Sequence, residues 1–184
     1  MALSHAIMTA LIEDEMSGYE LAKAFDVSLG LFWHASHQQI YQELRKLVAR
    51  GWLEKEAVAQ QGKPDKSVHR LTGAGREALA EWVWGESKVQ EAKDDLWVKL
   101  YNLSADNVSR LSAEIAMRRK EMMGRLYLYE KIRRRHYDKP EALPLRRKGV
   151  YLALIAGIRQ GEQFLAWCDE ALELLAGVES SVAP

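Results

Sequence analysis

Short amphipathic helices open the chain, as the spacing of its apolar residues indicates. Apolar side chains three or four positions apart predict a first helix over residues 2–13. Ser17-Gly18-Tyr19-Glu20 and Ser36-His37-Gln38-Gln39 each fit a capping box, in which a serine and a later Glu or Gln satisfy backbone amides of one helix start. They predict a second and a third helix. The third is expected to end near Gly51, and its inward positions are Ile40, Leu44, Leu47 and Val48.

A two-stranded ribbon is predicted after the third helix. Residues 52–58 and 66–71 carry strand-compatible side chains, and the Gly and Pro of residues 60–65 mark a turn between them. Thr72 can cap a fourth helix with Leu79, Trp82 and Val83 on one side. This order predicts a winged helix-turn-helix domain with a two-stranded β wing over residues 1–85.

The remainder of the chain has an all-helical pattern. Helices are predicted over residues 94–102, 105–137 and 145–176, and two prolines separate the last two. Two helices alone cannot cover the wide apolar stripes, so a second copy of the chain is the simplest partner. The fold class is therefore mainly α, with a helical dimerisation domain over 86–178 and a flexible tail over 179–184.

Composition bounds the compartment and the class of protein. The chain has 184 residues, 48% of them hydrophobic, which suffices for a packed core. Its single cysteine, Cys168, cannot form an internal disulfide, and the first residues lack the basic flank of a signal peptide. No apolar run approaches the ~20 residues that span a bilayer. We expect a cytoplasmic protein with no membrane partner.

Charge is neutral overall but uneven along the chain. The 26 Lys and Arg balance 26 Asp and Glu, so a high isoelectric point does not argue for nucleic-acid binding. Residues 110–148 carry thirteen basic and five acidic side chains, whereas residues 149–184 carry one and five. This asymmetry predicts pairing between helices or between subunits, in preference to a nucleic-acid patch in the basic segment.

Several stretches of the first domain stand in a characteristic order and spacing: Ser17-Gly18-Tyr19-Glu20-Leu21, Trp33-His34-Ala35-Ser36 with Ile40-Tyr41 and Leu44, Arg50-Gly51-Trp52-Leu53, and Lys63-Pro64-Asp65-Lys66 with Leu71-Thr72 and Gly75-Arg76. Together they resemble the PadR family of bacterial transcriptional regulators, in the longer-chain branch of AphA-like virulence activators. The resemblance implies a homodimer that binds DNA through its third helix and wing, often as a repressor relieved by a small molecule. The chain departs from the family at Gln42, usually proline, and at His69, usually aromatic.

The outward face of the third helix supplies the candidate base contacts. On a helical wheel Gln38, Gln42 and Arg45 point away from the core, where Gln can pair with adenine and Arg with guanine. An ordinary solvated helix face is the alternative. The candidate phosphate contacts are Ser36, His37 and Tyr41 at the helix start, Lys63 and Lys66 on the wing, and Tyr19, whose ring could instead pack in the core.

Trp97 and Tyr101 are one helical turn apart and could line a pocket for a small aromatic effector, with dimer core as the alternative. The sequence carries no Gly-rich phosphate loop and no nucleophile or metal motif, so it predicts no enzyme activity, cofactor or metal. We therefore expect a repressor that binds double-stranded DNA at a pseudo-palindromic operator. A protein-docking module with an idle recognition helix and a sensor of planar aromatics remain alternatives.

Overall fold

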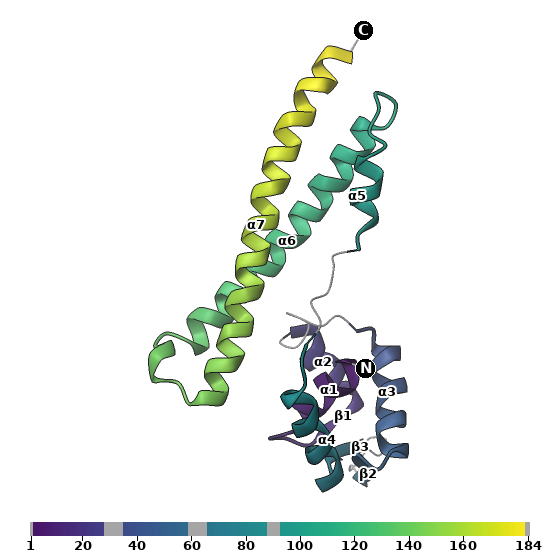
Figure 1. The fold of residues 1–184 in the computed structure, drawn as a ribbon, viewed down its shortest axis with the longest axis vertical. Helices are drawn as coiled ribbons and strands as arrows, with labels where there is room; N and C mark the ends of the chain where they lie inside the picture. The colour runs from purple at the N-terminus through teal and green to yellow at the C-terminus, as the bar shows by residue number, and fades with distance from the viewer. Residues whose placement is uncertain (1, 28–34, 59–65, 88–92, 183–184) are drawn as a thin grey trace. The chain divides into compact units, whose positions relative to one another are not determined.

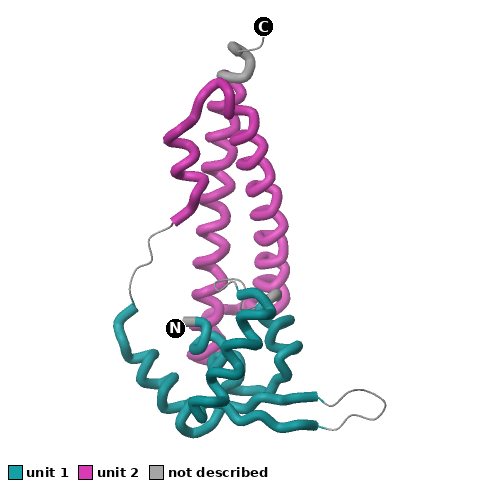
Figure 2. Tube along the Cα trace, turned by 90° about the vertical axis from the view of Figure 1, so that its right-hand side faces the viewer, with its two compact units in different colours: residues 1–89 teal, residues 90–184 magenta. Residues whose placement is uncertain are grey.

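The chain forms two compact units, Met1–Val89 and Gln90–Pro184. Figure 1 shows the ribbon of the computed structural model, and Figure 2 gives each unit its own colour. The structure describes residues 2–27, 35–58, 66–87 and 93–182. The division between the units falls four residues after the boundary predicted at residue 85.

The first unit has the predicted order of helices and strands, and its third helix and wing agree with the sequence prediction. The first helix ends at Ala10, before the predicted end at residue 13, because the next amides change to shorter-range hydrogen bonds: Leu11 donates to Met8 as well as to Ile7, and Ile12 donates to Thr9. The elements are α1 (Ala2–Ala10), β1 (Met16–Ser17), α2 (Gly18–Val27), α3 (His37–Ala49), β2 (Leu53–Val58), β3 (Lys66–Leu71) and α4 (Gly73–Trp84).

The wing belongs to a three-stranded antiparallel sheet in the order β1-β3-β2. β2 and β3 pair along their whole length, from Leu53 opposite Leu71 to Val58 opposite Lys66, and Figure 2 shows them side by side. The third strand, β1, places Met16 opposite His69 and was not predicted. A strand of two residues is too short to give an alternating pattern, so the sequence carried no signal for it.

A single core holds the helices of this unit against the base of the wing. Its buried side chains come from all four helices and from both long strands: Ile7, Met8, Leu11, Leu21, Ala22, Phe25, Ile40, Leu44, Leu47, Leu53, Leu71 and Leu79. The predicted inward face of α3 is confirmed at Ile40, Leu44 and Leu47, whereas Val48 is only partly buried against this core. Leucine and isoleucine dominate the set, and burying each such side chain stabilises the fold by ~1.5–3 kcal/mol.

A close corner joins α3, β2 and α4. Gly51 has φ of 71°, a left-handed conformation that glycine adopts without steric cost. Thr72 caps α4 by accepting from Gly75, and its hydroxyl donates to the carbonyl oxygen of Gly51 at 2.7 Å. A Cβ at Gly75 would lie 2.2 Å from the carbonyl oxygen of Trp52. The backbone of α4 therefore approaches β2 as closely as a glycine permits.

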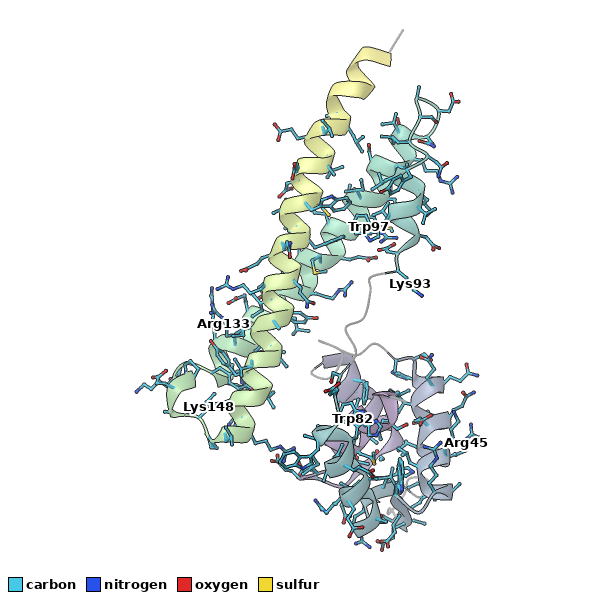
Figure 3. All side chains as sticks on the ribbon, viewed as in Figure 1. Arg45, Trp82, Lys93, Trp97, Arg133 and Lys148 are labelled. Atoms are coloured by element: carbon cyan, nitrogen blue, oxygen red, sulfur yellow. The ribbon has the colours of Figure 1, made fainter. Side chains whose placement is uncertain are left out.

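The end of α4 differs from its prediction. Leu79 is buried as expected, but Trp82 is 46% exposed and Val83 is 67% exposed, so these residues do not form one inward face. The ring of Trp82, labelled in Figure 3, stacks on His5 of α1 at 4.3 Å. Residues 81–84 are all exposed, so the buried face of α4 ends at Leu79.

The second unit is a helical hairpin with a short helix against it. It contains α5 (Asp95–Leu100), α6 (Val108–His136), the 3-10 helix η2 (Pro140–Ala142) and α7 (Leu145–Val182). Figure 1 shows α6 and α7 side by side and antiparallel. α7 extends six residues past its predicted end at 176, into the segment predicted to be a tail. No helix among the described residues is long and apolar enough to cross a membrane.

A network of charges fixes α5 on α6. Asp94 caps α5 by accepting from the amide of Leu96 at 2.9 Å, and it accepts from Arg118 of α6 at 2.5 Å. Glu114 accepts from both Arg118 and Lys99, each at 2.9 Å. The Arg118 guanidinium lowers the pKa of the Asp94 carboxyl. Below this network, the second core contains Leu96, Val108, Leu111, Ile115, Leu175 and the buried Cys168.

Candidate nucleic-acid interface

The start of α3 has the predicted capping box. Ser36 accepts from the amide of Gln39 at 3.2 Å, and the Gln39 side chain accepts from the amide of Ser36 at 2.8 Å. Because the Ser36 oxygen acts as acceptor here, its hydroxyl hydrogen is left to donate to another group. The cap also leaves the first turn of α3 exposed, with amides directed out of the helix end. This end can receive an anion.

The outer face of α3 is exposed where the sequence predicted base contacts. Gln38, Gln42 and Arg45 are all exposed, whereas Ile40 and Leu44 on the opposite side are buried. Figure 3 shows Arg45 on this helix. These three side chains carry both donors and acceptors, which match the edges of bases in the major groove. Ser36 and His37 are also exposed, one turn or less before Gln38.

The start of α2 contains a second capping box that extends to the wing. Glu20 accepts from the amide and the hydroxyl of Ser17, at 2.8 and 2.9 Å, and its other oxygen accepts from Lys66 of β3 at 2.7 Å. These hydrogen bonds, the one from Lys66 first, lower the pKa of Glu20 to about 2. Lys66, a predicted phosphate contact, therefore has a carboxylate partner in the free protein.

An open groove of about 1190 Å³ lies between α2, α3 and the wing. It brings together four of the predicted DNA contacts, Tyr19, Tyr41, Arg45 and Lys66. Tyr19 is 67% exposed, so its ring does not pack in the core of the described unit. Ser36, His37, Gln38 and Gln42 are not among the described residues that line the groove, and Lys63 lies outside the described residues.

Tyr41 lies directly over the first residue of α2. A Cβ at Gly18 would lie 2.3 Å from a carbon of the Tyr41 ring. The absence of a side chain at Gly18 thus allows the ring to cross the start of α2, while 44% of Tyr41 remains exposed. Tyr41 and the start of α2 therefore lie in the same groove.

Three further polar residues of the groove were not predicted: Lys23, Lys55 and Ser67. Lys23 follows Tyr19 by four residues, so helical spacing alone could have placed the two on one face of α2. Lys55 lies opposite His69 in the β2–β3 register, which the sequence does not fix in advance. Together with Arg45 and Lys66, the two lysines give the groove four cations against the single carboxylate of Glu20.

His69 occupies the position where an aromatic residue was expected from the resemblance. It is buried, with 6% of its surface exposed, and burial lowers the pKa of its imidazole. Burial thus favours the neutral form of the ring, which replaces the expected aromatic as a packed ring in the lining of the groove.

The structure does not bring Trp97 and Tyr101 together in one pocket of the single chain. Trp97 packs its ring edge-on against Trp167 of α7, with 4.7 Å between ring centroids, whereas Tyr101 is 94% exposed. α5 ends at Leu100, so Tyr101 lies just past the turn that contacts α7. A pocket of about 540 Å³ beside α5 is lined by neither residue.

Two family descriptions match consecutive parts of the chain. The transcriptional regulator PadR-like family matches residues 7–81, and the virulence activator alpha C-terminal family matches residues 92–176. A probable transcriptional regulator of Mycobacterium tuberculosis is 37% identical over 95% of this chain and 98% of its own length.

Solved structures of two proteins are similar over nearly the whole chain. Bacillus subtilis PadR in complex with operator DNA has a TM-score of 0.75 at 28% identity, covering 95% of this chain and 99% of its own. The same protein with p-coumaric acid gives 0.70 at 27% identity, with coverage of 96% and 99%. The Vibrio cholerae virulence activator AphA gives 0.75 at 28% identity, again with coverage of 96% and 99%.

Proposed function

The chain belongs to the PadR-like family of transcriptional regulators, and from this premise we propose that it binds a pseudo-palindromic operator as a homodimer and represses transcription. The family consists of regulators and not of enzymes. The observation that carries the proposal is the exposed outer face of α3, with a capped start and a cationic groove beside it. The complex of Bacillus subtilis PadR with operator DNA supports it.

In this proposal α3 reads bases and the groove holds the backbone. Gln38, Gln42 and Arg45 contact base edges in the major groove. Phosphate contacts come from Ser36, His37, Tyr19 and Tyr41, and from the wing lysines Lys63 and Lys66. When Lys66 binds a phosphate, it gives up its ion pair with the Glu20 carboxylate. The loss of this ion pair offsets part of the interaction energy between Lys66 and DNA.

Exposed apolar side chains on the second unit support the homodimer. Large side chains on α6 and α7 have about half or more of their surface exposed, on helices that otherwise form one core. Such a surface favours a partner with the same two helices, and a two-fold dimer matches a palindromic site. The residues are Met117, Met123, Tyr127, Val150, Leu152 and Leu174.

We extend the proposal to a small aromatic effector that releases the operator. The complex of Bacillus subtilis PadR with p-coumaric acid supports this class of ligand. Trp97 contacts Trp167, whose ring also contacts Phe164, so a planar aromatic bound near α5 would quench tryptophan emission. Quenching by hydroxycinnamates that is lost in Trp97→Phe and accompanied by operator release would support the effector. Quenching without release would contradict it.

Selection of bound duplexes from a random DNA pool tests the operator. We expect the native chain to enrich a palindromic site and the double variant Gln38→Ala/Arg45→Ala to lose it. The matched control is Arg159→Ala/Gln163→Ala, which removes the same residue types from exposed positions of α7 and should keep the site.

A protein-docking module is the second candidate, because residues 1–89 carry ten Lys and Arg against twelve Asp and Glu. A net charge of −2 is unusual for a domain that binds DNA on its own. If a folded native dimer enriches no duplex, the operator proposal is wrong and the docking module is favoured.

A further inference from the structure

The turn of the helical hairpin is strongly basic. Residues 131–148, here called the basic tip, run from the end of α6 through η2 to the first turn of α7. They contain eight Lys and Arg, against the two carboxylates of Asp138 and Glu141. Most of the tip is exposed to solvent. Nothing in the proposed operator contact uses it.

Acidic residues of α7 lie mostly away from the tip. Arg119 pairs with Asp169 at 2.6 Å, which places this part of α7 beside the first half of α6, and Glu162 shares a small pocket with Arg133. Within α6, Arg134 pairs with Glu130 at 3.9 Å, and Arg133 pairs with Glu130 at 2.9 Å. Pairing between helices thus accounts for Arg119, whereas pairing between subunits, which the sequence also predicted, stays a prediction.

Helix stability explains only part of the charge of the tip. The cations that end α6 lie at the negative end of its dipole, where they are favourable. The first turn of α7 contains Arg146, Arg147 and Lys148 and no acidic residue. Cations at this end of a helix are unfavourable by a few tenths of a kcal/mol each at an exposed site. The helix dipole therefore does not account for the cations at the start of α7.

One face of α6 concentrates this charge at the tip. Tyr127, Glu130, Lys131, Arg134 and Arg135 line an open hollow of about 440 Å³. Lys131 and Arg135 are four residues apart, so they lie on the same side of the helix, and Arg134 is 81% exposed. A guanidinium offers paired donors that match phosphate oxygens.

We propose that the basic tip binds the phosphate backbone of duplex DNA outside the operator contact. This inference rests on the proposed function, which brings DNA to the protein. The net charge of −2 on residues 1–89 provides little long-range attraction for a polyanion, whereas the tip carries a net charge of +6. DNA is therefore the occupant that the charge distribution favours.

Salt dependence of DNA affinity tests the tip. The variant Lys131→Gln/Arg134→Gln/Arg135→Gln removes three exposed cations from the tip. The matched control Lys93→Gln/Lys120→Gln/Arg159→Gln removes three exposed cations from the same unit outside it. Affinity is measured in the full chain, from low to physiological salt, for three duplexes. They are the minimal selected operator, the same operator with about 20 flanking base pairs on each side, and a long duplex of arbitrary sequence.

Each phosphate contact adds about 0.9 to the slope of log affinity against log salt. We expect the tip variant to lose between about 2 and 3 from this slope on both long duplexes, with at least a roughly tenfold weaker affinity at low salt. On the minimal operator it should bind like the native chain. The control should keep the native slope on all three.

Equal slopes for the tip and control variants would overturn the proposal. The salt dependence of DNA binding would then depend on the net charge of the protein and not on where the cations lie. A tip variant with the native slope but a weaker dimer in sedimentation would also overturn the proposal. The tip would then be assigned to a contact between subunits. The duplex of arbitrary sequence separates the two proposals: loss of binding there in the tip variant supports the tip even where no operator is selected.

Discussion

Glu20 connects the start of α2 to the wing through three hydrogen bonds to a single carboxylate. It accepts from the backbone and side chain of Ser17 and from Lys66. A carboxylate in such a site binds its proton weakly, because protonation would break these hydrogen bonds. Since the side chain is still 44% exposed, we assign the ion pair less than about 1 kcal/mol of stability.

The titration of Glu20 provides the first prediction. Its pKa of about 2 lies below the ordinary 4.5, so its stabilising effect is complete above pH 4.5 and disappears as the pH falls towards 2. We expect a midpoint near pH 2 for the Glu20 carboxyl carbon in NMR. In Lys66→Met, which removes the largest cause of the shift, the midpoint should rise towards 4.5. An unchanged midpoint would contradict the ion pair.

Gly75 provides a second prediction at this scale. A methyl group at this position would collide with the backbone oxygen of Trp52, which cannot rotate away as a side chain can. We expect Gly75→Ala to lower the free energy of unfolding by at least about 2 kcal/mol in denaturant titrations. Gly73→Ala, in the same first turn of α4 with no atom within 4 Å, should leave it nearly unchanged or slightly raised.

At the scale of elements, α3 combines a capped start with an exposed polar face. Both features were predicted, because a capping box and a 3.6-residue period are local properties of the sequence. The groove could be predicted only in part. Tyr41 was identified as a residue near a helix start, but its position over Gly18 depends on how α2 and α3 pack.

Two substitutions of Ser36 separate the cap from the DNA contact. Ser36→Asp keeps an N-cap acceptor but adds a negative charge where a phosphate is proposed, so we expect near-native stability and at least tenfold weaker operator binding. Ser36→Ala should instead lower the free energy of unfolding by about 1 kcal/mol. Thermal unfolding and operator affinity measure the two effects. Native operator affinity in Ser36→Asp would exclude a phosphate at this helix start.

The unpredicted elements share a physical cause. β1 is a strand only because β3 offers it an edge, and the ends of α4 and α7 depend on what packs against them. Trp82 and Val83 follow the apolar pattern of α4 but extend past the core. Local periodicity thus predicted which elements exist, whereas tertiary contacts set the limits of burial and the short pairings.

At the scale of the whole molecule, the apolar face of the second unit predicts association. Leu152 and Leu174 are 60% and 73% exposed on α7. If they contact a second copy, Leu152→Glu/Leu174→Glu should weaken the dimer at least tenfold, a change of about 1.4 kcal/mol in the free energy of association. Sedimentation velocity over a range of concentrations measures this. Gln160→Glu/Gln163→Glu adds the same charge at exposed polar positions and should leave the dimer intact.

Cys168 has a consequence for experiments on this protein. It is the only cysteine of the chain, it is fully buried in the core of the helical unit, and burial raises the pKa of its thiol. A thiol reagent can therefore modify it only after α6 and α7 separate. When closing is faster than modification, the labelling rate reports the free energy of that separation without an introduced probe. A ligand or DNA that stabilises the packing of α6 on α7 would slow the labelling, and the ratio of the two rates would give the gain in free energy of separation.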